Sequence, residues 1–325
     1  MKMMPLQKRE ISTSRVVYGC MGLGGGWNHD SITKDDIIQA EKAMEAALST
    51  GITMFDHADI YKMGKSETVF GKVLRERTDL REKIVLQSKC GIRFPEENAP
   101  QRYDFSKEHI LQSVDGTLER LGVEYLDVLL LHRPDPLMEP EEVAIAFDVL
   151  YEAGKVRHFG VSNMTAAQMK LIQKYSSHPI VVNQLEMSLK RIDWVEQGVL
   201  VNQKAGAGVN FADGIMEYCR MEDIQIQAWG PLAKGMFTGG SLVNPCEAVL
   251  HTKEVVEKMA REKETTAEAI VLGWLMRHPA MIQPVIGTAN PERIKNCEDA
   301  VRQSEIMTRE EWYTLYVAAR GDKIP

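Results

Sequence analysis

The stretch RVVYGCMGLGGGW, residues 15–27, joins a short apolar run to a glycine-rich turn. An apolar strand followed by glycines is typical of α/β proteins, in which two fold classes can begin this way. An open, doubly wound sheet that binds a dinucleotide needs the spacing GxGxxG at this turn and a ribose-binding acid about 20 residues later. Residues 22–27 read GLGGGW and lack that spacing, so the sequence disfavours the open sheet.

The rest of the chain repeats a strand pattern followed by a helical pattern, eight times in all. We predict the strands at residues 15–24, 52–59, 84–90, 127–132, 156–163, 180–188, 224–232 and 281–288. No linker rich in Pro, Ser or Gly divides these units, and regular crossovers between parallel strands allow eight strands to close on themselves. The sequence therefore predicts an α/β protein with one (β/α)8 TIM barrel spanning residues 1–325.

Smaller elements are predicted around the barrel. Residues 3–12, MMPLQKREIS, are expected to form a short N-terminal hairpin, and a C-terminal helix is expected to close the chain. A long helical region at 247–278 should be interrupted near Thr265 and Thr266, and residues 290–305 should form one further helix.

Composition and charge narrow the class of partner. The 325 residues carry a net charge of −7 with acids and bases mixed, so no basic stripe is available for nucleic acid. No apolar run approaches the roughly 20 residues of a membrane helix, and the first residues lack the apolar core of a signal peptide. The five cysteines are widely spaced and form no CxxC pair. These features predict a protein of the reducing cytoplasm with a small-molecule partner and no membrane association.

Candidate site residues lie where the predicted strands end, because barrel enzymes build their sites from the carboxyl ends of the strands and the loops that follow. A lysine that closes an apolar strand, Lys89, is costly to bury unless a carboxylate meets it, and Asp56 on the neighbouring strand is the natural partner. The other candidates at strand ends are Tyr61, His132, Ser162, Asn163, Gln184, Trp229, Gly287 and Thr288.

Four of these residues make a proton-transfer site. The ammonium of Lys89 should stabilise the phenolate of Tyr61 and lower its pKa, which makes the phenol a better acid near neutral pH. A neutral His132 could donate a hydrogen bond to the same substrate oxygen. A carbonyl held in this way still needs a hydride, which no side chain supplies, so a nicotinamide cofactor is expected. The alternative is a purely structural ion pair between Asp56 and Lys89.

A metal site is the other chemistry to weigh for FDHADIY, residues 55–61. Strand residues alternate in direction, so Asp56 and Ala58 should point one way, and His57 and Asp59 the other. These groups cannot share one ion, and outside this cluster only His132 ends a strand. A metal-dependent barrel hydrolase therefore remains a remote alternative, and we predict no metal site.

The motifs resemble those of the aldo-keto reductase family. FDHADIYKMGKSETVFG at 55–71 is similar to the family pattern FDxAxxYxxGxSExxxG, and QSKCG, LLLHRPD, GVSN, NQLEMS and AWGPLAKGMFTG follow in the family's order. GCMGLGGGWN and the ending WYTLYVAARGDKIP look most like a bacterial YdhF-like branch of predicted oxidoreductases.

The resemblance implies reduction of an aldehyde or ketone to an alcohol by NADPH, with NADH as a possible substitute. Tyr61 would be the general acid, Lys89 and Asp56 its tuning pair, and His132 the residue that orients the carbonyl. Ser162, Asn163 and Gln184 would bind the nicotinamide carboxamide, and Trp229 would stack beneath the ring. The remaining cofactor contacts would come from Gly230, Pro231, Leu232 and Gly235 at the pyrophosphate, from Gly287 and Thr288 after the last strand, and from Arg293 at the adenosine 2′-phosphate.

Substrate choice is left open by these motifs. Trp27 and the loops at 92–105 and 190–214 should stand around the site mouth, and the second loop could be a lid or a mobile surface segment. An aldehyde, a ketone, a sugar and a quinone all remain candidates, and the oligomeric state is undetermined. The alternative function is a regulatory or redox-sensing subunit that binds the cofactor with little turnover.

Overall fold

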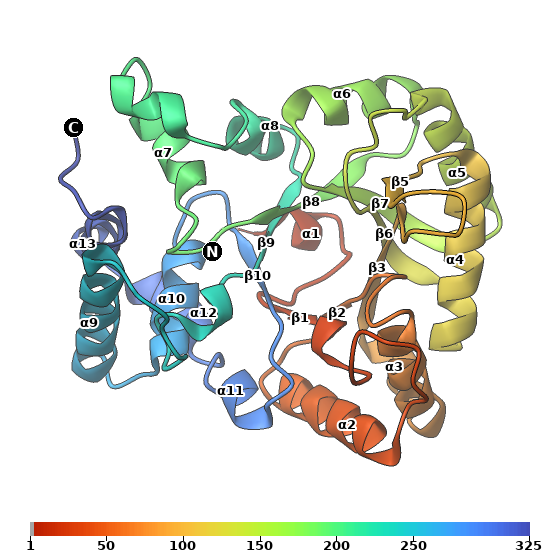
Figure 1. The fold of residues 1–325 in the computed structure, drawn as a ribbon, viewed down its shortest axis with the longest axis horizontal. Helices are drawn as coiled ribbons and strands as arrows, with labels where there is room; N and C mark the ends of the chain where they lie inside the picture. The colour runs from red at the N-terminus through yellow and green to blue at the C-terminus, as the bar shows by residue number, and fades with distance from the viewer. Residues whose placement is uncertain (1–2) are drawn as a thin grey trace.

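The computed structural model describes residues 3–325, and its parallel strands close into a barrel (Figure 1). Going around the barrel, the strand order is β1, β10, β9, β8, β7, β6, β3, β2. The strands are β1 Val17–Gly19, β2 Met54–Asp56, β3 Val85–Cys90, β6 Leu126–Leu131, β7 Val156–Ser162, β8 Ile180–Glu186, β9 Gln225–Trp229 and β10 Gln283–Ile286. The predicted (β/α)8 barrel is confirmed, although residues 1 and 2 of the expected domain lie outside the described part.

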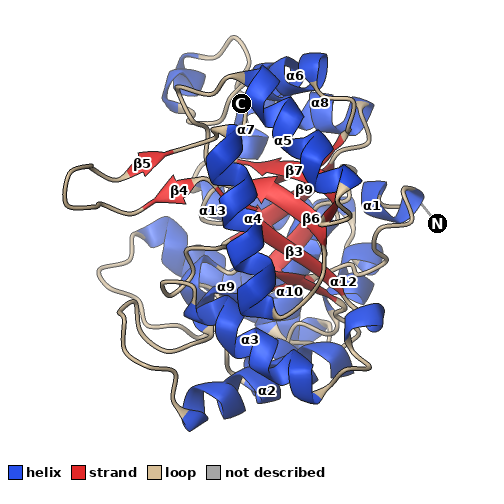
Figure 2. Cartoon of the chain, turned by 90° about the vertical axis from the view of Figure 1, so that its right-hand side faces the viewer, coloured by secondary structure: helices blue, strands red, loops and turns tan. Residues whose placement is uncertain are grey.

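Helices form the outer layer around the strands (Figure 2). They are α2 Lys34–Ser49, α3 Lys65–Glu76, α4 Lys107–Leu121, α5 Pro140–Glu152, α6 Ala166–Tyr175, α7 Asp193–Val199, α8 Ile215–Met221, α9 Glu247–Glu262, α10 Ala267–Met276, α11 Pro291–Lys295, α12 Ala300–Ile306 and α13 Arg309–Arg320. Several begin at a threonine that caps free backbone amides. Thr33 and Thr165 form capping boxes at α2 and α6, which fixes where each helix starts after its loop.

The long helical region breaks where the sequence predicted. Thr266 caps α10 by accepting a hydrogen bond from the amide of Ala269, so α9 and α10 are separate helices. The single helix expected at 290–305 is instead two helices, α11 and α12. The hydroxyl of Thr266 donates to the carbonyl of Asn296, and the hydroxyl of Thr265 donates to Asp299, between the two helices. These bonds accompany the interruption at residues 296–299.

The expected N-terminal hairpin is wrong, because residues Pro5–Lys8 form a short helix, α1. Proline has no N–H for a strand ladder, and its fixed φ suits the first turn of a helix. The next residue, Leu6, is fully buried among apolar side chains of the barrel strands, including Val17 and Val285. Burial of Leu6 explains why the segment folds against the barrel. Figure 2 places α1 at the opposite end of the barrel from the β4–β5 hairpin.

The loop at 92–105 contains a hairpin that the sequence did not predict. It consists of β4 Ile92–Arg93 and β5 Arg102–Tyr103, which pair antiparallel. Arg93 of β4 stabilises the hairpin through an ion pair of 2.8 Å with Asp104, which follows β5. The hairpin follows β3 directly and projects from the barrel (Figure 2). Among residues 3–325, no helix has the length and apolar character that crossing a membrane requires.

Candidate active site

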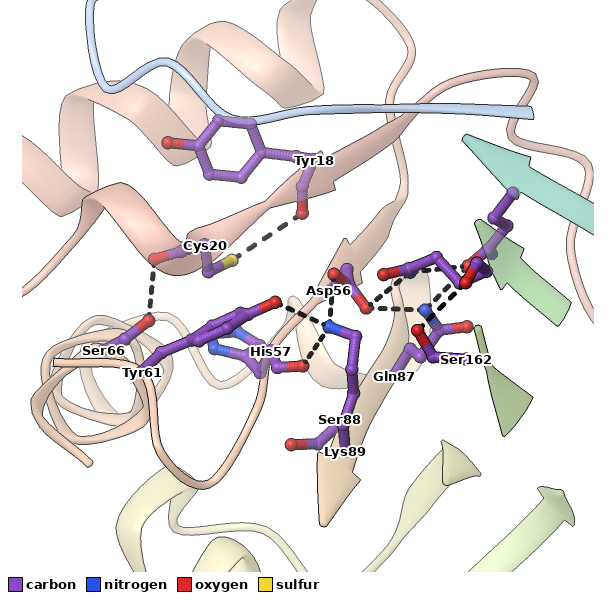
Figure 3. A network of polar contacts seen from close by, with 12 residues as sticks. Tyr18, Cys20, Asp56, His57, Tyr61, Ser66, Gln87, Ser88, Lys89 and Ser162 are labelled. Atoms are coloured by element: carbon purple, nitrogen blue, oxygen red, sulfur yellow. Dashed lines mark hydrogen bonds and ion pairs between the residues drawn. The ribbon is translucent and has the colours of Figure 1, made fainter. Parts of the chain in front are cut away.

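Lys89 lies at the centre of the polar network at the carboxyl ends of strands β2 and β3 (Figure 3). Its Nζ is 2.7 Å from Oδ2 of Asp56, 2.8 Å from the carbonyl oxygen of His57 and 2.9 Å from the phenol oxygen of Tyr61. The Lys89 side chain is 1% exposed, so its charge depends on these partners. The ion pair predicted between Asp56 and Lys89 is therefore present, and it touches the phenol directly.

The backbone around Tyr61 is fixed by pairing and by left-handed residues. The amides of His57 and Asp59 donate to the carbonyls of Gln87 and Lys89, at 2.8 and 3.0 Å, which extends the pairing of β2 with β3 beyond Asp56. After Tyr61, the residues at 62, 63 and 64 have φ of 54°, 59° and 82°. Non-glycine residues adopt positive φ at a cost, so contacts elsewhere in the loop must hold them there.

Burial and the electrostatic interaction between Lys89 and Tyr61 together determine the charge states of these two residues. Burial works against the ammonium, but the Asp56 carboxylate and Tyr61 outweigh it, and the pKa of Lys89 is raised. Burial raises the pKa of Tyr61, and the nearby Lys89 ammonium only partly offsets this. We expected a net lowering of the Tyr61 pKa, and the net direction is the opposite because desolvation dominates. Tyr61 is thus a neutral phenol at neutral pH and keeps the proton that an acid must donate.

His132 follows β6 and faces the same phenol. The ring centroids of Tyr61 and His132 are 6.0 Å apart, with the planes at 80°. Burial lowers the pKa of His132 well below its ordinary value, with further lowering from the charges of Lys89 and Arg133. The imidazole is therefore neutral and carries one N–H that can donate to a substrate oxygen. Its Nδ1 is buried and has no hydrogen-bond partner among the described residues.

A row of glutamine amides inside the barrel was not predicted. Oδ1 of Asp56 accepts hydrogen bonds from Nε2 of Gln87 at 2.6 Å and of Gln184 at 3.2 Å. Both amides also donate to Oε1 of Gln227, and Nε2 of Gln227 in turn donates to Oε1 of Gln283 at 3.0 Å. The only signal in the sequence is a glutamine within each of four otherwise largely apolar strands, β3, β8, β9 and β10. The amide of Gln184, expected at the nicotinamide, thus bonds to Asp56 and Gln227 in this structure.

Three of the expected cofactor residues form one corner beside the barrel mouth. Nε1 of Trp229 donates to Oδ1 of Asn163 at 3.1 Å, and Nδ2 of Asn163 donates to the Ser162 hydroxyl at 2.8 Å. That hydroxyl donates to the carbonyl of Gln184 at 2.9 Å. Asn163 has a φ of 57°, a backbone conformation that asparagine tolerates better than most residues. Side chains from the ends of β7 and β9 are thereby locked together.

The loop after β9 is tightly curled around glycines. Gly230 and Gly235 have φ of 65° and 82°, and the Gly240 amide donates to the Gly235 carbonyl at 2.7 Å. A Cβ at Gly235 would lie 2.9 Å from the guanidinium of Arg293. Arg293, in α11, donates to the Thr238 carbonyl at 3.1 Å and so ties that helix to this loop.

The other expected cofactor residues lie close by in the chain. Pro231 is buried and Leu232 is half-buried within the same loop. Gly287 and Thr288 follow β10 directly, and the Thr288 hydroxyl accepts from the amide of Asn290, the cap residue of α11. The structure therefore brings the glycine loop, the end of β10 and Arg293 to one side of the barrel mouth.

Trp27 lies on the loop after β1 and is 46% exposed. Nζ of Lys62, the residue after Tyr61, is 5.5 Å from the centre of its indole ring. In the loop at 190–214, Trp194 of α7 packs edge-on against Trp274. A cavity of about 570 Å³ lies beside Trp194 and α13, and neither the four proton-transfer residues nor Trp27 lines it. We therefore identify the candidate active site by its group of proton-transfer residues and not by the size of a cavity.

Comparison with known proteins agrees with the motifs. The family model described as Aldo/keto reductase family matches residues 15–311. The 6-dehydroglucose reductase of Agrobacterium fabrum is 35% identical over 319 residues, which cover 97% of each chain. The oxidoreductase YdhF of Escherichia coli is 35% identical over 284 residues, 87% of this chain and 88% of its own. The resemblance to YdhF-like oxidoreductases is confirmed.

Solved structures share the fold. An aldo-keto reductase from Klebsiella pneumoniae, in complex with NADPH, matches with a TM-score of 0.70 over 93% of this chain and 89% of that chain. The two sequences are 22% identical, so this likeness establishes the shared barrel and no more.

Proposed function

Because the chain belongs to the aldo/keto reductase family and is thus an oxidoreductase, we propose that it uses NADPH to reduce an aldehyde or ketone to an alcohol. One observation carries the proposal. A buried ammonium, that of Lys89, contacts both the Asp56 carboxylate and the Tyr61 phenol, with the neutral ring of His132 facing that phenol. A structural ion pair alone would not need the phenol and the imidazole beside it.

Each of the four residues has a distinct task. His132 donates a hydrogen bond to the carbonyl oxygen and orients it toward Tyr61. As hydride reaches the carbonyl carbon, the oxygen gains negative charge and takes the proton of Tyr61, which yields the alcohol. The ammonium of Lys89 then stabilises the tyrosinate until it regains a proton. Asp56 keeps Lys89 charged and in place, and the amides of Gln87 and Gln184 hold the Asp56 carboxylate.

The residues present fit a nicotinamide cofactor, which would supply the hydride. The indole of Trp229 offers a flat face beside Asn163 and Ser162, whose amide and hydroxyl suit a carboxamide. At Gly230 a Cβ would meet nothing within 4 Å, which supports a backbone open to a pyrophosphate. Arg293 can bind the 2′-phosphate of NADPH, and NADH would lack that contact.

The remaining assignments belong to the same proposal. We place the protein in the cytoplasm as a single domain that acts on a small-molecule carbonyl compound, with no nucleic-acid or membrane partner. Its cysteines are free thiols, and Cys246 is exposed, which suits a reducing compartment.

A turnover assay tests the proposal. The purified chain, without added metal, should oxidise NADPH when given 4-nitrobenzaldehyde, an activated aromatic aldehyde, and EDTA should leave the rate unchanged. Loss of NADPH absorbance is the measurement. Activity that a chelator abolishes and zinc restores would contradict the proposed metal-free reduction. Tight NADPH binding without turnover on a panel of aldehydes and ketones would instead favour the regulatory or redox-sensing alternative.

A further inference from the structure

Arg133 is a charged residue of the site that the mechanism above does not use. It follows His132 directly at the end of β6 and is half-buried. The central carbon of its guanidinium is 5.5 Å from the centre of the Trp229 ring. Its charge also contributes to lowering the pKa of His132, after burial and Lys89. The guanidinium thus lies beside the imidazole that orients the carbonyl and the indole proposed to lie beneath the nicotinamide.

No acidic partner compensates Arg133. Among residues 3–325, no carboxylate oxygen lies within 4.0 Å of its guanidinium nitrogens. Asp135, two residues away, accepts hydrogen bonds from the backbone amides of Phe105 and Leu137 at 2.8 and 2.9 Å. The one carboxylate in the proton-transfer group, Asp56, is paired with Lys89.

A half-buried cation with no anion is an unfavourable arrangement for the protein alone. The face of Trp229 attracts the guanidinium, but this attraction replaces only part of the lost hydration. Lys62, which follows Tyr61, has the same surroundings, since it lies over Trp27 and has no acid within 4.0 Å among the described residues. Both residues that would bind the carbonyl oxygen are therefore followed in sequence by a cation without an acidic partner.

We infer that the substrate is a carbonyl compound carrying an anionic group, such as a carboxylate, and that Arg133 binds this group. The inference rests on the proposed function, because it places the reacting carbonyl at Tyr61 and His132. A planar guanidinium can give two parallel hydrogen bonds to a carboxylate. The anion would supply the charge that the site lacks, and it would fix the distance between the recognised group and the carbonyl.

Two aldehydes of similar size provide the test. We compare kcat/KM for 4-carboxybenzaldehyde, which is anionic at neutral pH, with that for uncharged 4-nitrobenzaldehyde, at saturating NADPH. The carboxy-to-nitro ratio should fall about 10- to 100-fold in Arg133→Gln, the loss expected for hydrogen bonds to a charged group. Arg133→Lys keeps the charge but loses the two parallel hydrogen bonds, so the ratio should fall by less than it does in Arg133→Gln. Arg220→Gln, an exposed arginine of α8, is the matched control and should not change the ratio.

Other results would overturn the inference. An equal fall for both aldehydes in Arg133→Gln would mean that Arg133 supports Trp229 or His132 rather than the substrate. Weaker NADPH binding with an unchanged ratio would assign Arg133 to the cofactor. A carboxy-to-nitro ratio that is equally low in wild type and Arg133→Gln would show that the site does not recognise the anion.

A binding measurement separates this inference from the proposed function. 4-Carboxybenzamide cannot be reduced, and its affinity for the complex with NADP+ is measured by calorimetry. If wild type reduces neither aldehyde, the proposed function fails. Affinity that is then about 10-fold weaker in Arg133→Gln would still support anion binding at Arg133. Affinity that is independent of Arg133, or no binding at all, would refute it.

Discussion

At the scale of single residues, Tyr61 and Lys89 share one hydrogen bond but play different parts. In the proposed mechanism the phenol acts on the developing alkoxide, whereas the ammonium, which contacts both Asp56 and the phenol, sets the state of the phenol. Removing the phenolic hydroxyl should therefore affect the proton step and leave the cofactor contacts in place.

Tyr61→Phe should lower kcat by about 10²- to 10⁴-fold, the usual contribution of general acid catalysis. NADPH affinity, measured by fluorescence titration, should stay within a few-fold of wild type. The buried ring is preserved in this variant, so the fold is not at risk. If the variant retained half of the wild-type kcat, the acid role would have to move to another residue, with His132 the next candidate.

Arg293 is the residue that we propose sets a preference for NADPH over NADH. In the structure its guanidinium donates to the carbonyl and hydroxyl of Thr238 and lies 3.7 Å from Glu268. A bound 2′-phosphate would compete for these donors. Arg293→Ala should weaken NADPH binding by roughly 10- to 150-fold and barely change NADH binding, because NADH has no 2′-phosphate.

Titration of both cofactors into wild type and Arg293→Ala is the measurement. The contacts to Thr238 give a specific contrary outcome. Equal weakening for NADH and NADPH would show that Arg293 acts by tying α11 to the glycine loop rather than by binding phosphate.

At the scale of elements, α3 and α4 approach each other closely at one glycine. A Cβ on Gly71 of α3 would lie 2.4 Å from the carbonyl oxygen of Arg120 and 2.6 Å from that of Leu121. Since α3 begins just after Tyr61, this packing also fixes the loop that carries the Tyr61 phenol.

Gly71→Ala should destabilise the protein by about 1–3 kcal/mol, because overpacking forces the helices apart. Gly198→Ala in α7 is the matched control, since its Cβ would meet nothing within 4 Å. Helix propensity alone would make the control neutral or slightly stabilising, by up to about 1 kcal/mol. Urea midpoints of both variants measure this, and a Gly71→Ala midpoint equal to that of the control would contradict the close packing.

At the scale of the whole molecule, the barrel could be predicted because apolar strand patterns alternate regularly with helical patterns, and several of the strands end in or just before a polar residue. The ends of the predicted strands also indicated Asp56, Lys89 and His132 as candidate site residues. Prediction from the sequence failed for features that depend on contacts between segments far apart in the chain. The helix at Pro5–Lys8 depends on Leu6 filling the barrel floor, and the amide row depends on distant strands facing each other. The net pKa of Tyr61 depends on burial, which only the closed barrel reveals.

Burial by the closed barrel also predicts a pH effect on stability through Asp59. Its Oδ1 is buried and has no hydrogen-bond partner within residues 3–325. Burial together with the nearby Glu67 carboxylate raises its pKa to about 7, although Arg120 partly offsets this. An aspartate in the unfolded chain has a pKa near 3.9. Between these values the folded state binds the proton more tightly, so this contribution to stability is present at pH 4 and is lost as the pH rises through 7.

The side chain introduced in Asp59→Asn cannot ionise, so this variant should not lose stability through this position as the pH rises through 7. Relative to wild type, the variant should gain about 1 to 3 kcal/mol of stability between pH 5 and pH 8. Comparing variant with wild type at each pH cancels the opposite effect of His57, whose lowered pKa of about 3 makes the fold more stable as the pH rises toward 6.5. Urea midpoints at both pH values measure the difference, with the exposed Asp115→Asn as control. A difference between Asp59→Asn and wild type that does not change with pH would mean that Asp59 is already ionised in the folded protein at pH 5.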